Sequence, residues 1–332
     1  MTESVPSDVF SSASRAAGRA AAALWPEAAC ALLPGAAVGT AFGLAQRFAR
    51  RSDWPDHLPP TRQIELAVHA VLYAAWIARH LDGVRGGARI MALNGGQGSG
   101  KSTLCALARM ALETHFELRT TVISIDDLYL TIAERRRLAG AVHPLLATRG
   151  VPGTHDLSLG AEVLDRLAGA PGTEVAIPRF DKAVDDRLPR SQWDPVAAPV
   201  DVVLLEGWCV GAGPLPRADL GDPRNALEAE ADADGIWRTF IADQLEGPYA
   251  AFFARIDALA MLRVPDFAAV GRFREAQEAR MRETRGVGMS PEEVQRFISH
   301  YQRVTEHQLE TLPERTALCF ELDADHAIVA VR

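Results

Sequence analysis

Short apolar runs alternate with longer helical stretches from residue 89 to the end of the chain. The runs are RIMALN, TTVISID, TEVAIPRF, VDVVLLEG, DALAMLRV, ALCFELD and AIVAVR. Apolar runs of about four to eight residues bounded by turn formers predict buried strands. Strands that alternate with helices are typical of a mostly parallel sheet with helices on both faces. We therefore predict an α/β domain over residues 86–332.

The first 85 residues follow a different pattern. In QIELAVHAVLYAAWIARHL, apolar residues such as Ile64, Val68 and Val71 recur close to helical spacing. Residues 28–45 carry no charge, but their Ala and Gly content and the Pro34-Gly35 pair favour two helices joined by a turn over a membrane span. Residues 1–85 are therefore predicted to form a helical extension that packs on protein.

A helix start is predicted late in the chain, at SPEEVQRFISHYQRVTEHQL. Ser290 is a good N-cap residue, Pro291 suits the first helical position, and Glu293 completes a capping box. Apolar residues recur at helical spacing behind this start, and we predict that they face the core. They are Val294, Phe297, Ile298, Tyr301 and Val304.

The composition argues against several kinds of protein. A net charge of -8 opposes a general nucleic-acid binder, because such proteins need a broad basic face. The cysteines Cys30, Cys105, Cys209 and Cys319 are scattered without metal-like spacing, which favours free thiols in a reducing compartment. MTESVPSDVF lacks the basic and apolar segments of a signal peptide, so we predict a cytoplasmic protein. The sequence does not indicate an oligomeric state.

One glycine-rich segment, LNGGQGSGKST, has the pattern of a phosphate-binding loop between a strand and a helix. Glycines let backbone N–H groups turn toward phosphate oxygens, and the helix N-terminus adds partial positive charge. Lys101 is one of only two lysines among 35 basic residues, and its compact ammonium fits a narrow loop where a guanidinium would not. Ser102 can hold Mg²⁺. The predicted ATP-binding residues are Gly95, Gly96, Gln97, Gly98, Ser99, Gly100, Lys101, Ser102 and Thr103.

Two apolar runs end in carboxylates. Asp126 and Asp127 follow TTVISI, and Glu206 ends VDVVLLEG. Since the carboxyl ends of parallel strands line the ligand crevice, Asp126 is our candidate base and metal ligand, and Glu206 our candidate metal ligand. The alternative interpretation is a helix cap or solvated turn for the aspartates and a metal-free strand-end acid for Glu206.

Charged segments between the strands supply further candidates. The second lysine, Lys182, lies in IPRFDKAVDDRLPRSQW, and HPLLATRGVPGTHD is a loop with embedded charges. A solvated charged loop is the alternative for the first segment. GRFREAQEARMRETRG predicts an arginine-bearing lid over the phosphates or, alternatively, a solvated helix with Glu–Arg pairs. Its arginines are Arg272, Arg274, Arg280, Arg282 and Arg285.

Taken together, NGGQGSGKST, SIDDLYL, HPLLATRGVPGTHD, IPRFDKAVDDRLP and VVLLEGWCVG resemble the D-glycerate 3-kinase family in content and order. That family belongs to the wider P-loop group of uridine kinases, phosphoribulokinases and bacterial pantothenate kinases. The resemblance covers about residues 89–325 and leaves the first 85 outside. It implies a three-layer P-loop sandwich and an enzyme that uses ATP and Mg²⁺ to phosphorylate a small hydroxyl compound.

The resemblance also implies roles for individual residues. DDLY aligns Asp126 with the base of the group's D-x-F-Y pattern, with Leu128 in place of the aromatic residue. FDKAVDDR occupies the place of a substrate-contacting segment, and its cations would suit a carboxylate such as that of glycerate. The resulting substrate-binding candidates are Asp127, Tyr129, Arg149, His155, Asp181, Lys182 and Arg187. Open alternatives are another acceptor, such as a nucleoside, pantothenate or a sugar acid, and an ATP-binding switch that hydrolyses ATP slowly.

Overall fold

The computed structural model describes residues 11–26, 34–48, 58–81, 87–286 and 288–332. Its main sheet has the strand order β10-β9-β8-β1-β7-β2, and β10 alone runs antiparallel to its neighbour. The bounds are β1 (Arg89–Gly95), β2 (Thr120–Ser124), β7 (Val202–Gly207), β8 (Ala258–Arg263), β9 (Leu318–Leu322) and β10 (Ile328–Val331). The predicted α/β class, with a mostly parallel sheet, is confirmed.

One predicted strand lies outside this sheet. TEVAIPRF forms β3 (Glu174–Ile177), which pairs antiparallel with β6 (Asp194–Ala197) in a separate ribbon. Between them, β4 (Phe180–Asp181) and β5 (Asp186–Arg187) form a short hairpin. The segment from 174 to 197 is therefore an insertion beside the main sheet, and the hairpin carries Lys182.

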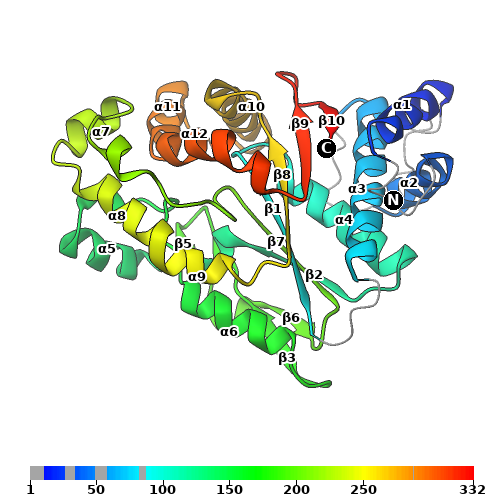
Figure 1. Ribbon diagram of the computed structural model, residues 1–332, viewed down its shortest axis with the longest axis horizontal. Coiled ribbons are helices and arrows are strands. Elements are labelled where there is room, and N and C mark those ends of the chain that lie inside the picture. Colours follow the sequence, from blue (N-terminus) through cyan, green and yellow to red (C-terminus); the bar gives the residue numbers. More distant parts are fainter. Residues whose placement is uncertain (1–10, 27–33, 49–57, 82–86, 287) are drawn as a thin grey trace.

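Helices cover both faces of the sheet (Figure 1). On one side are α1 (Ser12–Ala23), α2 (Pro34–Phe48), α3 (Pro60–Leu81) and α4 (Lys101–His115). The other helices are α5 (Ile132–Ala141), α6 (Leu157–Leu167), α7 (Ala226–Ala231), α8 (Ile236–Gln244), α9 (Ala250–Phe253), α10 (Phe267–Arg285), α11 (Pro291–Ser299) and α12 (Gln302–Thr311).

The central strands are buried on both faces, as parallel strands between two helical layers must be. In β1, Met91 and Leu93 join the core under α3 and α4, while Ile90 and Ala92 join the opposite core. The same alternation holds along β7. Burial of successive side chains on opposite faces explains why these runs are continuously apolar instead of alternating with polar residues.

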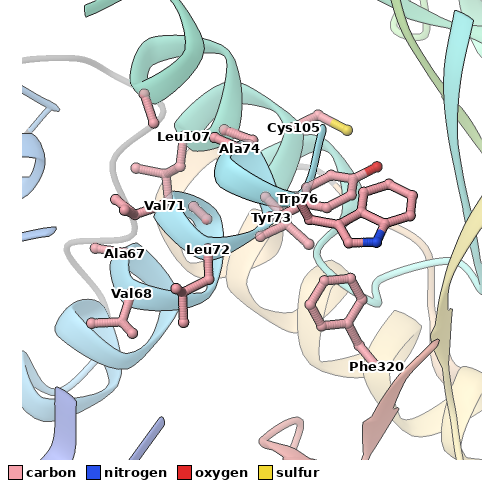
Figure 2. Packing of buried hydrophobic residues seen from close by; sticks show 14 of the residues in the cluster. Ala67, Val68, Val71, Leu72, Tyr73, Ala74, Trp76, Cys105, Leu107 and Phe320 are labelled. Atoms are coloured by element: carbon pink, nitrogen blue, oxygen red, sulfur yellow. The ribbon is translucent and has the colours of Figure 1, made fainter. Parts of the chain in front are cut away.

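The predicted helical extension shares a core with the sheet. In Figure 2, side chains of α3 pack between α4 and Phe320 of β9. Tyr73 stacks on Trp76 at 5.9 Å and meets Phe320 edge-on at 5.7 Å between ring centroids. Trp25, just after α1, also meets the Phe320 ring edge-on, at 5.4 Å. The apolar core continues from the helical extension into the sheet, so a domain boundary at residue 85 stays a prediction.

The described residues also bear on the predicted N-terminal helices, the capping box and the free cysteines. Of the two helices predicted within residues 28–45, the second corresponds to α2, which begins at Pro34, and the first falls on residues 27–33, outside the described part of the chain. No described helix is long and apolar enough to cross a membrane. The capping box of Ser290 and Glu293 is confirmed, although the helix is divided into α11 and α12. Cys105, Cys209 and Cys319 are buried free thiols, while Cys30 lies outside the described residues.

Replacement of Phe320 by alanine tests the shared core. The ring contacts the sheet and the extension together, so we expect one cooperative unfolding transition whose free energy of unfolding falls by about 3–5 kcal/mol. Denaturant unfolding followed by tryptophan fluorescence and circular dichroism measures it, with the exposed Val329→Ala as control. Two separate transitions, only one of them shifted, would contradict a shared core.

Candidate active site

The phosphate-loop segment turns tightly between β1 and α4. Gly98 and Gly100 have φ of 75° and 92°, a left-handed conformation that glycine adopts at little cost. Lys101 is the first residue of α4, and its Nζ donates to the Gly96 carbonyl at 3.0 Å. Burial lowers the pKa of Lys101, while the carboxylates of Glu206 and Asp126 oppose that shift. The loop therefore presents a desolvated ammonium and a free helix N-terminus to the same space.

Glu206 lies beside this loop because of the sheet register. β7 runs between β1 and β2, so Glu206 is opposite Leu93 on one side and Ser124 on the other. Its Oε1 accepts a hydrogen bond from Ser102 Oγ at 2.8 Å, and the residue is buried. A hydroxyl and a carboxylate in a polar cavity are hard oxygen donors, and this donor set fits Mg²⁺.

Asp126 lies in a short 3₁₀ helix, Ile125–Leu128, directly after β2. Its carboxylate accepts from Lys182 Nζ at 2.6 Å and from Tyr129 OH at 2.8 Å. Burial alone would raise the pKa of Asp126, but the Lys182 ammonium and these two hydrogen bonds outweigh it and lower the pKa. Reciprocally, the Asp126 carboxylate raises the pKa of Lys182. Asp126 is therefore ionised at neutral pH.

Asp127 holds the hairpin that carries Lys182. It accepts from Arg179 Nη1 at 2.7 Å and from the Phe180 backbone N–H at 3.1 Å. Burial raises the pKa of Asp127, although Arg179 opposes the shift. Adjacent aspartates thus have different surroundings: Asp126 faces the cavity, whereas Asp127 ties β4 to the end of β2.

A second set of contacts holds the far end of the same hairpin. The fully buried Arg135 donates to Asp185 Oδ2 at 2.5 Å and to the Leu130 carbonyl at 2.7 Å. Arg149 forms an ion pair with the same carboxylate, and both guanidinium groups lie within 5.6 Å of the Phe180 ring centroid. Two ion pairs to Asp185 and two cation–π contacts to Phe180 therefore fix the hairpin that carries Lys182.

Aromatic residues form the wall next to Arg149. Tyr301 OH donates to the Arg149 carbonyl at 3.2 Å, and Trp208 Nε1 donates to the Gly150 carbonyl at 3.0 Å. The two rings meet edge-on with centroids 4.8 Å apart. An added Cβ at Gly150 would lie only 2.1 Å from Tyr301 OH, so glycine is required for this close approach.

These groups surround one cavity of about 530 Å³. Among the candidates from sequence, the lining includes Gln97, Gly98, Gly100, Lys101, Ser102, Thr103, Asp126, Tyr129, Arg149, Lys182 and Glu206. Candidates outside the lining are Gly95, Gly96, Ser99, Asp127, His155, Asp181 and Arg187. Phosphate-loop residues, both strand-end acids and both lysines of the chain thus face the same space.

His155 and Arg187 are not among the residues that line the cavity. His155 is buried, stacks on Tyr129 with ring centroids 4.6 Å apart, and contacts Tyr249 OH through Nδ1 at 2.5 Å. Burial lowers the pKa of His155 to about 4, so the ring is neutral at pH 7. Arg187 pairs with Asp156 at 3.1 Å. His155 thus supports Tyr129 in the cavity wall, and substrate contact by His155 or Arg187 stays a prediction.

Several residues that line the cavity were not predicted from the sequence. Phe297 and Tyr301 belong to an apolar stripe that was expected to face the core, and His326 lies in the turn between β9 and β10. Of the predicted lid arginines, Arg274 and Arg280 line the cavity, whereas Arg272 and Arg282 do not. The aromatic residues gave no distinguishing signal, because a cavity-facing aromatic and a core aromatic have the same helical spacing.

A glycine-rich loop after the central strand of a β9-β8-β1-β7-β2 parallel sheet, with Glu206 at the end of β7 and Asp126 directly after β2, defines a P-loop kinase. No protein-family model matches the chain. It is 33% identical to the uncharacterized kinase mug58 of Schizosaccharomyces pombe over 250 residues, 71% of this chain and 87% of that protein. The chain belongs to the D-glycerate 3-kinase family of P-loop kinases.

Two relatives carry the family's name. The chloroplastic D-glycerate 3-kinase of Arabidopsis thaliana is 33% identical over 224 residues, 65% of this chain and 46% of that protein, so less than half of the plant enzyme is matched. The solved structure of D-glycerate 3-kinase from Cryptococcus neoformans has a TM-score of 0.65 and 27% identity. That alignment covers 79% of this chain and 96% of the fungal one.

Replacement of Lys182 by methionine tests its electrostatic effect on Asp126. The pKa of Asp126 should rise, because the variant removes the ammonium and a hydrogen bond but leaves the burial that raises the pKa. Titration of the Asp126 carboxyl carbon by ¹³C NMR measures this, and Lys182→Arg, which keeps the charge, should leave the pKa low. An unchanged pKa in the methionine variant would contradict the pairing.

Proposed function

We propose that this protein uses ATP and Mg²⁺ to phosphorylate a hydroxyl group of D-glycerate. The observation that carries the proposal is the meeting of two pairs in one cavity, Ser102 with Glu206 and Asp126 with Lys182, next to Lys101. Ser102, Glu206 and Lys101 suit a nucleoside triphosphate, and the pair of Asp126 and Lys182 suits an alcohol acceptor. The printed names of the plant and fungal relatives support glycerate as that acceptor.

The donor side of the reaction follows from the loop. Backbone N–H groups from Gly98 to Thr103 and the N-terminus of α4 would bind the phosphate oxygens. Lys101 would neutralise charge on the terminal phosphates, and an anion there would restore the charged state that burial disfavours. Mg²⁺ held by Ser102 and Glu206 would further neutralise the phosphate oxygens when bound.

The acceptor side follows from Asp126. Its low pKa makes it a weak base, so its main contribution would be to accept a hydrogen bond from the acceptor hydroxyl and aim it at the γ-phosphorus. Phosphoryl transfer passes through a loose transition state in which the hydroxyl proton leaves late, so orientation outweighs base strength. Lys182 would hold the carboxylate in place and contribute positive charge to the reacting groups.

Cations around the acceptor end favour an acidic substrate. Arg149 and Lys182 line the cavity beside Asp126, and Arg274 and Arg280 extend from α10 on another side. Positive side chains would bind the carboxylate of a small hydroxy acid and exclude a neutral acceptor of similar size. The buried free thiols fit a reducing compartment, and we propose that the reaction occurs in the cytoplasm.

The acceptor is identified by measuring ADP release from Mg-ATP with D-glycerate, L-glycerate, uridine, pantothenate and a sugar acid. D-Glycerate should stimulate release most strongly, and Lys101→Ala should abolish the stimulation because the phosphates lose their buried cation. Preference for another compound would contradict the substrate. Tight ATP binding with no stimulation by any compound would contradict the kinase activity and favour a switch.

Replacement of Asp126 by asparagine tests whether Asp126 orients the acceptor hydroxyl without contributing to ATP binding. We expect kcat to fall roughly 10²-fold, the cost of a misplaced reacting group, while the dissociation constant of Mg-ATP stays within a factor of a few. Asp222→Asn, at an exposed position, is the matched control. Equal losses in kcat and in ATP affinity would argue against the assigned role.

A further inference from the structure

A second cavity, of about 410 Å³, lies between the N-terminal extension and the phosphate loop. One side is formed by α1 and α3, and the other by the first turn of α4 and the turn between β9 and β10. Leu24, Leu66, Leu104 and Leu262 give it an apolar lining. Its volume falls within the roughly 300–1,000 Å³ of small-molecule sites.

This cavity adjoins the one that contains the candidate active site. Gly100, Thr103 and His326 line both cavities, so the first turn of α4 and the β9–β10 turn form their common border. Part of that border is a tilted stack of His326 on Phe273, with centroids 4.3 Å apart. A nucleotide with its phosphates on Lys101 to Thr103 would cross this border to place its nucleoside on the far side.

Side chains with hydrogen-bond donors and acceptors also line the second cavity. Trp25 Nε1 donates to His69 Nδ1 at 3.0 Å, and burial lowers the pKa of His69 to about 3. The neutral ring therefore accepts at Nδ1 and carries its proton on Nε2, and His69 is one of the residues that line the cavity. Glu65 supplies carboxylate acceptors, and Arg62, its partner at 3.0 Å, also reaches the Asp325 carbonyl.

We propose that this second cavity binds the base and ribose of the nucleotide, with the N-terminal extension as one wall. A flat heterocycle with a donor and acceptor edge matches apolar walls that carry a His donor and a Glu acceptor. This assignment rests on the proposed function, because it requires the phosphates to occupy the loop. It gives the extension, which lies outside the sequence resemblance, a part in nucleotide recognition.

An obstructing side chain at the rim tests the assignment. Ala20 is exposed on α1 and lines the cavity, so Ala20→Trp would fill the space without disturbing the core. Ala13→Trp, on the same helix and away from the cavity, is the matched control. Calorimetry would measure binding of Mg-ATP and of Mg-tripolyphosphate, which has phosphates but no nucleoside.

We expect Ala20→Trp to weaken Mg-ATP binding at least tenfold, with tripolyphosphate binding unchanged and Ala13→Trp like the wild type in both. Wild-type affinity of Ala20→Trp for Mg-ATP would place the nucleoside elsewhere and overturn the proposal. Failure of the wild type to bind either compound would overturn the proposed function, and with it this inference. D-Glycerate-dependent ADP release by Ala20→Trp at saturating ATP would show that the proposed function holds, whatever the position of the nucleoside.

Hydrogen exchange of the wild-type protein tests the same point without a substitution. Mg-ATP should slow exchange of backbone amides in α1 and the first half of α3 relative to Mg-tripolyphosphate, because only the nucleoside reaches that wall. Equal protection by both compounds would overturn the proposal. Slower exchange in α10 alone would place the base against Phe273 in the active-site cavity and would also overturn it.

Discussion

The parallel pairing of β7 with both β1 and β2 is the constraint on which the site depends. This pairing sets Glu206 opposite Ser124 and next to the start of the phosphate loop. Continuous burial on both faces fixes the register, because a slip by one residue would move every apolar side chain of β7 to the opposite layer. The packing that stabilises the sheet therefore also sets the positions of Ser102, Glu206 and Asp126.

The two lysines illustrate how local chemistry is placed on this frame. Both ammonium groups line a cavity bordered by Glu206 and Asp126, in a chain that otherwise uses arginine. Lys101 belongs to α4 itself, whereas Lys182 reaches Asp126 from a hairpin that Asp127 and Arg135 hold. A compact ammonium can contact one carboxylate oxygen closely and leave the other for Tyr129. Lys182 thus keeps Asp126 ionised without occupying both of its oxygens.

Much of this arrangement could be predicted from the sequence, for physical reasons. The apolar runs predicted six strands of the main sheet, and the glycine-lysine pattern predicted the loop, because both signals are local. TEVAIPRF was also predicted as a strand, but its pairing with residues 194–197 depends on an insertion that periodicity does not describe. Tyr301 and His326 were missed as lining residues because only the folded chain brings α12 and the β9–β10 turn to the loop.

The proposed phosphoryl transfer requires the phosphate loop and Asp126 to act on the same acceptor within one cavity. The most direct test is ³¹P NMR of the wild-type protein with Mg-ATP and D-glycerate. Transfer to the terminal hydroxyl predicts a new phosphomonoester signal that two methylene protons split into a triplet, appearing as the ATP signals decline. A signal from inorganic phosphate alone would show hydrolysis without transfer and would contradict the account.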